Sequence, residues 1–145
     1  MGSVVYDRAG QNVGNVLSLE HINVAVTDQI KATVFYIMGL GFTRDPYRSF
    51  GVDNMWVNLG SQQMHLPTRS APQVIPGYIG IVLPDLDALV ERLRLIADRL
   101  IGTQFDWSQH SDYVEVICPW GNYFRCYLAD DQMSMNNQGI ICVNF

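Results

Sequence analysis

Hydrophobic and polar residues alternate along residues 17–26, which is the pattern of a β-strand. One face of this strand is apolar and carries Ile22, Val24 and Val26. The opposite face carries His21 and an amide side chain. We therefore expect the face with His21 to meet water or a ligand.

The same alternation returns in residues 77–83, where Tyr78 takes the place that His21 has in the first strand. Each strand runs into an aspartate, Asp28 in the first case and Asp85 in the second. Aspartate is a favoured N-cap residue, so a helix is expected after each strand. The sequence is therefore interpreted as one structural unit written twice.

Apolar residues at helical spacing predict helices over residues 28–38 and 85–100, which end at Gly39 and Gly102. Three short strand-like segments follow each helix, at 42–49, 54–60 and 62–67 in the first half and at 104–108, 113–118 and 122–128 in the second. The predicted fold class is α+β, with two tandem βαβββ units.

These patterns divide the chain into a lead-in, one domain and an extension. The domain spans residues 17–128 and consists of a first unit, a linker and a second unit, at 17–67, 68–76 and 77–128. Residues 1–16 precede it and residues 129–145 follow it. The run 140–145 has the pattern of a strand, and we expect it to add to a sheet edge or to pair across a dimer interface.

Composition and charge exclude several classes of function. The 145 residues have a net charge of −5 and no clustered Lys or Arg, so no nucleic-acid partner is expected. No apolar run is long enough for a membrane span, and the amino terminus lacks the pattern of a signal peptide. The three cysteines form no metal-binding pair, which favours reduced thiols and a cytoplasmic protein.

Several segments resemble the vicinal oxygen chelate superfamily, which includes glyoxalase I, bleomycin-resistance proteins, fosfomycin-resistance enzymes and extradiol dioxygenases. They are Leu-Glu-His-Ile-Asn-Val-Ala-Val at 19–26, Phe-Tyr-Ile-Met-Gly-Leu-Gly-Phe at 35–42, Gln-Gln-Met-His-Leu-Pro at 62–67, Leu-Pro-Asp-Leu-Asp-Ala-Leu at 83–89 and Pro-Trp-Gly-Asn-Tyr-Phe at 119–124. The resemblance implies curved mixed sheets that form a cup, with the helices outside.

The resemblance also implies four positions in the cup at which metal-dependent members carry their ligands. These positions are His21, His65, Tyr78 and Arg125 here, and only His21 matches the usual residue type. An arginine has no acceptor atom and keeps its positive charge, and tyrosine must ionise before it binds a metal well. We therefore predict no metal cofactor, with His21 and His65 as the only remaining candidate ligands.

Strand alternation places further side chains in the same cup. Glu115 has the parity to pair with Arg125, although a bound carboxylate or phosphate would serve equally well as its partner. Trp56, Tyr113, Tyr123 and Tyr127 have parities that give the cup aromatic walls, whereas His110 lies in a polar turn and is expected to touch solvent. The predicted ligand-binding residues are His21, Trp56, His65, Tyr78, Glu115, Tyr123 and Arg125.

Three functions remain open. The favoured one is a metal-free protein that binds a small organic molecule in the cup. The alternative is a lyase, isomerase or dioxygenase that depends on a metal or uses His21 and His65 as catalytic acid and base. The third is a structural or regulatory dimer without a ligand. A homodimer is expected from the resemblance and from the strand-like run 140–145.

Overall fold

The computed structural model describes residues 19–48, 51–129 and 139–144, so the predicted lead-in 1–16 and most of the polar stretch after residue 129 lie outside the described residues. The first unit contains β1 (His21–Asn23), α1 (Gln29–Ala32), the π-helical segment η1 (Thr33–Gly39), β2 (Thr43–Arg44), β3 (Asn54–Leu59) and β4 (Gln62–Pro67). The second contains β5 (Tyr78–Leu83), α2 (Leu86–Ile96), the 3-10 helix η2 (Ala97–Leu100), β6 (Asp106–Gln109), β7 (Tyr113–Ile117) and β8 (Tyr123–Leu128). A last strand, β9, spans Gly139–Asn144. The predicted α+β class with two βαβββ units is confirmed.

The two sheets repeat the same strand order. The first sheet runs β1-β4-β3-β2, and the second runs β6-β7-β8-β5-β9. When the second sheet is followed in the other direction, its strands β5-β8-β7-β6 have the same order as their equivalents in the first unit. The first and last strands of each unit are parallel, with Asn23 opposite His65 and Gly80 opposite Arg125. Asn23 follows His21 by two residues, and Gly80 follows Tyr78 by two residues. The registers of the two units therefore match, and His65 and Arg125 occupy equivalent positions.

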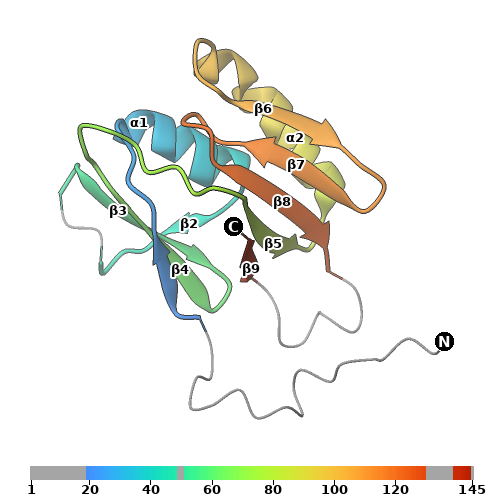
Figure 1. Cartoon of the computed structure of the whole chain (residues 1–145), viewed down its shortest axis with the longest axis horizontal. Helices are drawn as coiled ribbons and strands as arrows, with labels where there is room; N and C mark the ends of the chain where they lie inside the picture. Colours follow the sequence, from blue (N-terminus) through green and yellow to red (C-terminus); the bar gives the residue numbers. More distant parts are fainter. Residues whose placement is uncertain (1–18, 49–50, 130–138, 145) are drawn as a thin grey trace.

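Strand β9 pairs antiparallel with β5 and forms the edge of the second sheet (Figure 1). Tyr78 lies opposite Asn144 and Val82 lies opposite Gly139. Of the two outcomes expected for this run, the structure shows addition to a sheet edge of its own chain. The run therefore needs no second subunit to pair its backbone.

Both helices begin at their predicted caps. The Asp28 carboxylate accepts hydrogen bonds from the backbone N–H groups of Ile30 and Lys31 at 2.8 and 3.0 Å. Asp85 caps α2 in the same way through the N–H of Ala88, at 2.9 Å. The first helical segment ends at Gly39 as expected. Gly41 follows two residues later with a φ of +82°, which favours a residue without Cβ.

The first helix differs from the expected continuous α-helix over 28–38. From Thr33 onward its turns widen into a π-helix, and Leu40 donates its N–H to the carbonyl of Phe35 at 2.9 Å. Val34, Phe35 and Tyr36 are all buried, although they are consecutive. Simple 3.6-residue periodicity does not predict three neighbouring buried positions, so the sequence pattern missed the change of helix type.

The predicted strand over 42–49 is much shorter in the structure, where only Thr43–Arg44 pair with β3. The carboxylate of Asp45 accepts hydrogen bonds from the N–H groups of Tyr47 and Arg48, both at 2.8 Å, and turns the chain away from the sheet. Pro46 has no N–H for a strand ladder, which contributes to the same ending. The strand expected at 104–108 begins two residues later, at Asp106.

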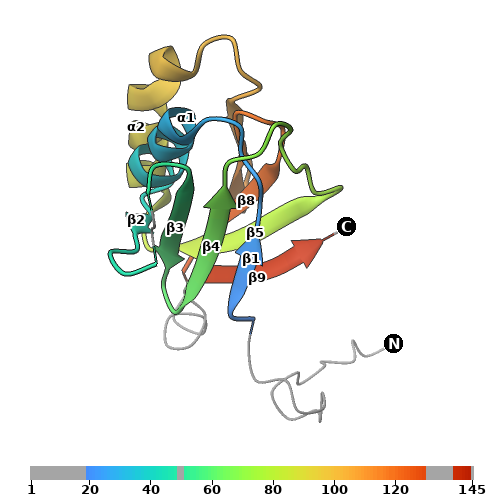
Figure 2. The same cartoon turned by 90° about the vertical axis from the view of Figure 1, so that its left-hand side faces the viewer.

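The helices lie together on one side of the molecule (Figure 2), and their buried faces join the two units. Phe35 of η1 packs its ring 5.8 Å from that of Phe124 on β8 and 6.1 Å from that of Phe105. Tyr36 lies 6.0 Å from the same Phe124 ring. The first unit's helix therefore buries aromatic side chains against a strand of the second unit, and the core is continuous.

The linker 68–76 is fastened to both units. Gln73 donates its N–H to the carbonyl of Ala25 in the first unit, at 3.0 Å. The buried amide of Asn122 donates to the Gln73 carbonyl and accepts from the Ile75 N–H, both at 2.8 Å. In this way one buried side chain of the second unit uses both its donor and its acceptor to fix the linker.

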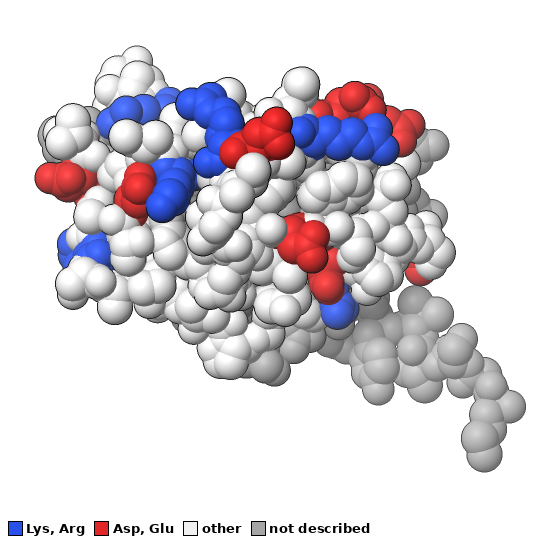
Figure 3. Space-filling model, turned by 90° about the horizontal axis from the view of Figure 1, so that it is seen from above, with Lys and Arg blue, Asp and Glu red and all other residues white. Residues whose placement is uncertain are grey.

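The face shown in Figure 3 carries positive and negative side chains next to one another and is not dominated by one sign. Ion pairs at the helices join Lys31 of α1 with the N-cap residue Asp28, and Arg94 of α2 with Glu91. Among the described residues, no helix has the length and apolar character required to cross a bilayer.

Candidate functional site

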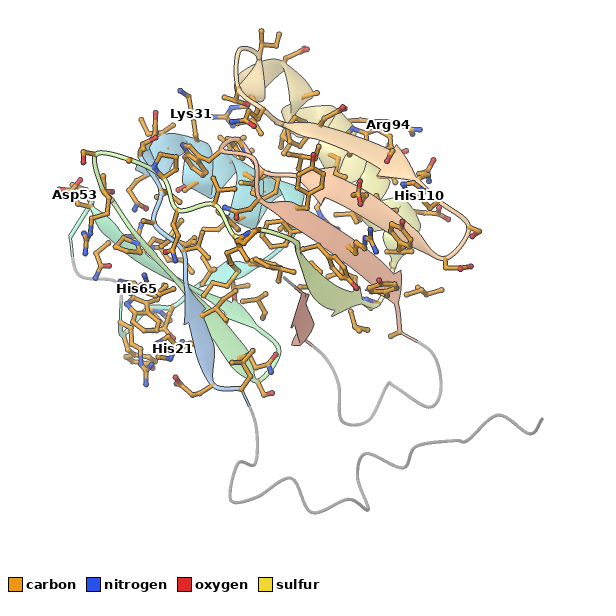
Figure 4. All side chains as sticks on the ribbon, viewed as in Figure 1. His21, Lys31, Asp53, His65, Arg94 and His110 are labelled. Atoms are coloured by element: carbon orange, nitrogen blue, oxygen red, sulfur yellow. The ribbon has the colours of Figure 1, made fainter. Side chains whose placement is uncertain are left out.

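An aromatic cluster lies on the face of the first sheet that alternation assigns to His21. Trp56 of β3 lies directly opposite His65 of β4, and their rings stack with centroids 4.3 Å apart and planes 12° apart. The ring of His21 lies 5.1 Å from that of Trp56 at 56°. The structure thus brings together three of the predicted site residues (Figure 4 labels the two histidines).

Polar side chains surround this aromatic cluster. The guanidinium of Arg48 lies over the Trp56 ring, with Cζ 5.2 Å from the centroid, and donates to Gln63 at 2.9 Å and to Glu20 at 3.3 Å. Gln63 in turn donates to Asp45 at 2.7 Å. Nη1 of Arg48 is therefore engaged by two groups of the chain itself.

The two histidines differ in electrostatic environment. His21 contacts the carboxylate of Glu20 through Nδ1, whereas Nε2 of His65 contacts the amide oxygen of Asn54. Burial lowers the pKa of His65, and the positive charges of His21 and Arg69 lower it further. His65 is therefore mainly neutral at neutral pH.

A second cluster lies on the equivalent face of the second sheet. The guanidinium Cζ of Arg125 lies 4.1 Å from the ring centroid of Tyr78 and 5.0 Å from that of Tyr113. Its Nε donates to Oε2 of Glu115 at 3.3 Å, across the register pair that joins β7 to β8. The ion pair expected from strand parity is present.

Arg125 keeps its charge in this setting. Partial burial is the largest single influence and disfavours the cation. The hydrogen bond and charge of Glu115 and the phenol groups of Tyr113 and Tyr78 together outweigh it, so the pKa of Arg125 is raised. The site therefore contains a permanent cation at neutral pH.

A hollow of about 260 Å³ opens over this cluster. It is lined by Gly77, Tyr78, Glu115, Tyr123 and Arg125, so four of the seven predicted ligand-binding residues share one concave surface. A separate cavity of about 150 Å³ lies between the units, next to Phe42, Leu59 and Val82, and contains none of the predicted site residues.

His110 extends the second cluster beyond what the sequence indicated. Its ring stacks on Tyr113 with centroids 4.6 Å apart and planes 20° apart, and Nε2 lies 3.0 Å from the Ser108 hydroxyl. His110 is exposed as expected, but it contacts more than solvent (Figure 4). Residue type and spacing gave no sign of this stacking, because it depends on the β6–β7 turn.

The predicted residues thus fall into two groups, one on each sheet, and each contact described for these site residues joins residues of the same unit. Sequence reasoning missed the polar partners Asp45, Arg48 and Asn54 of the first group, and also Asn58, whose amide oxygen accepts a hydrogen bond from Gln63 at 2.7 Å. Asn54 and Asn58 share the parity of Trp56 along β3, so alternation was a usable signal for them. Arg48 lies in the turn after β2 and had no such signal.

The residues at the four family positions do not fit a divalent metal ion. Arg125 places a fixed positive charge at one position, and the phenol of Tyr78, which is a poor ligand for such an ion, occupies another. Within the described part of the chain, no three His, Cys, Asp or Glu side chains are grouped as metal ligands. This donor set offers two imidazoles but lacks the carboxylates that such an ion also prefers.

Comparisons with known proteins identify the fold. A scan against protein-family profiles finds no match, and a search of curated protein sequences finds no similar protein. Among solved structures, the chain is similar to a glyoxalase family protein from Bacillus anthracis, with a TM-score of 0.58, 16% identity and coverage of 81% of this chain and 98% of that one.

Two other solved structures lead to the same fold. The fosfomycin resistance protein FosX from Listeria monocytogenes matches with a TM-score of 0.59, 13% identity and coverage of 79% of this chain and 93% of that one. A glyoxalase/bleomycin resistance protein/dioxygenase family enzyme from Burkholderia phytofirmans matches with a TM-score of 0.57, 13% identity and coverage of 75% and 96%. The chain therefore has the fold of the vicinal oxygen chelate superfamily, as its sequence motifs predict.

Proposed function

We propose that this protein binds a small organic molecule, without a metal ion, in the hollow over the second sheet. The observation that carries this proposal is the lining of the hollow, where Tyr78, Glu115, Tyr123 and Arg125 converge. Concave sites with aromatic walls and a few convergent polar groups are typical of small-molecule binding. A fold of this kind hosts many chemistries, so the proposal rests on the site and not on the fold.

Arg125 supports the metal-free part of the proposal. It occupies the strand position that corresponds to His65 in the first unit, and its positive charge opposes a divalent ion nearby. Glu115 is the nearest carboxylate, but it is already paired with Arg125. Binding through the guanidinium and the tyrosine rings needs no metal.

The test is native mass spectrometry of the purified full chain, combined with elemental analysis of the same sample. We expect a retained organic molecule, or one taken up from a small-molecule library, and clearly less than one equivalent of metal. Treatment with chelator leaves the melting temperature unchanged, since a tight native-state ligand would otherwise raise it. Stoichiometric metal whose removal lowers the melting temperature would overturn the proposal.

The histidine pair supports a second candidate function, acid–base catalysis on the first sheet. His65 has a lowered pKa and lies on the same Trp56 ring as His21. A neutral imidazole can act as a general base. This candidate becomes the better account if a co-crystallised ligand contacts the two histidines and leaves Arg125 untouched.

A further inference from the structure

Arg125 uses only part of its hydrogen-bonding capacity. Its Nε donates to Glu115 at 3.3 Å, which is a long distance for such a bond. Among the described residues, neither Nη1 nor Nη2 has a hydrogen-bond partner. A guanidinium presents several N–H donors in a planar fork, so within the described part of the chain the donors on these two atoms remain for another acceptor.

The tyrosine rings hold this fork in place without using its donors. Cζ of Arg125 lies over the ring of Tyr78 at 4.1 Å and near that of Tyr113 at 5.0 Å, and such contacts involve the faces of the guanidinium. The Arg125 side chain is 33% exposed, so it is partly withdrawn from water but can still be reached. A held and partly desolvated cation attracts an anion more strongly than a freely exposed one does.

The size and walls of the hollow limit what can bind there. Its volume of about 260 Å³ is below the roughly 300–1,000 Å³ that is typical for drug-sized ligands, which suits a molecule with about one ring. Tyr78 and Tyr123 offer aromatic surface for that ring. The planar fork of an arginine matches a carboxylate in a bidentate arrangement.

We infer that the ligand of the hollow is a small aromatic carboxylic acid, whose carboxylate accepts hydrogen bonds from Nη1 and Nη2 of Arg125 while its ring packs on the tyrosines. This inference rests on the proposed function and adds the chemical class of the ligand. Glu115 then has the same charge as the ligand. The Glu115 carboxylate holds the guanidinium but repels the incoming acid. Removal of Glu115 therefore raises the affinity for the acid, whereas removal of Arg125 lowers it.

The experiment is isothermal titration calorimetry on the full chain in the presence of a chelator, with benzoate, benzamide and benzylamine as probes. Benzoate is expected to bind at least about tenfold more tightly than benzamide, because it forms a charge-assisted pair. Arg125→Gln weakens benzoate binding at least about tenfold, and Arg125→Lys gives an intermediate affinity. Glu115→Gln strengthens benzoate binding and weakens that of benzylamine.

Arg94→Gln is the matched control. Arg94 also lies over an aromatic ring, with Cζ 5.9 Å from the centroid of Trp107, and donates to a carboxylate, that of Glu91, at 2.7 Å, but it lies on α2 outside the hollow. Its removal is expected to leave the affinity for benzoate unchanged. A melting curve shows whether each variant folds. If Arg125→Gln does not fold, the change in benzoate affinity caused by Glu115→Gln decides whether the hollow binds a carboxylate.

The possible failures are distinguishable. Equal binding of benzoate and benzamide, or a Glu115→Gln variant with unchanged or weakened benzoate binding, overturns the carboxylate inference and leaves the proposed function standing. If no probe binds and mass spectrometry finds no retained or captured organic molecule, the proposed function itself is wrong.

Discussion

Arg125 is the single residue with the largest consequence for the chemistry of this protein. Its register partner on the first strand of its unit is Gly80, and that of His65 is Asn23. Gly80 has no side chain, and the ring of Tyr78 on the same strand lies 4.1 Å from Cζ of Arg125. The second sheet thereby carries a cation on an aromatic ring where a metal-dependent protein of this fold would carry a ligand.

Reversing the charge at residue 125 tests whether the Arg125 cation excludes a metal ion from the second sheet. Arg125→Glu places a second carboxylate beside Glu115 and removes the cation, so we expect a measurable affinity for Mn²⁺ that the wild-type chain lacks. Calorimetry with MnCl₂ provides the measurement. Arg94→Glu is the control, because Arg94 lies on α2 next to Glu91 and outside the hollow. If the Arg125 variant binds no metal, the shape of the hollow and not the charge excludes it.

The lowered pKa of His65 predicts that the stability of the folded chain depends on pH. Its pKa is lowered in the folded chain, so the unfolded chain takes up this proton more readily. The free energy of unfolding is therefore expected to fall as the pH drops below about 6.5, the ordinary pKa of histidine, and to be unaffected by this group above it. Urea unfolding at a series of pH values, with His65→Gln as the comparison, measures this effect. Identical pH profiles of the two proteins would contradict the assignment.

At the scale of elements, local patterns predicted most of the fold. The caps Asp28 and Asp85 and the strand alternation around His21 and Tyr78 depend on neighbouring residues, and the structure confirms the elements that they mark. Features set by distant contacts were not predictable in this way. The π-helix η1 packs on a strand of the other unit, and the partners of Arg48 come from three different segments.

The contact between η1 and α2 offers a sharp test of packing. A Cβ on Gly39 would lie 2.5 Å from Cδ1 of Ile96, which is too close for two carbon atoms. Gly39→Ala is therefore expected to destabilise the protein by about 1–3 kcal/mol through overpacking. Chemical denaturation of the single and double variants measures the coupling, and Ile96→Val restores part of the loss because it removes Cδ1. No recovery in the double variant would mean that the cost of Gly39→Ala has another origin.

At the scale of the whole molecule, the repeated units form one body through a continuous core and a fastened linker. The sequence motifs predicted the pair of units but not the partner of the last strand, because a terminal strand can pair with any free edge. In the structure that edge belongs to β5. The binding roles of His21, Trp56 and His65 on the first sheet stay predictions.

The homodimer also stays a prediction, and it now rests on the resemblance alone, since β9 pairs within its own chain. Light scattering of the full chain across micromolar to millimolar concentrations is expected to give twice the chain mass of 16.4 kDa. A constant mass of one chain over this range would reject the dimer.

The most direct test of metal-free binding is the dissociation constant of benzoate, measured by calorimetry on protein that elemental analysis shows to be free of metal, and again after addition of Mn²⁺ or Zn²⁺. The account predicts binding in the metal-free protein, with an unchanged dissociation constant when metal is added, because Arg125 and the tyrosine rings provide the contacts. Binding that is absent without metal and present with it would contradict the account.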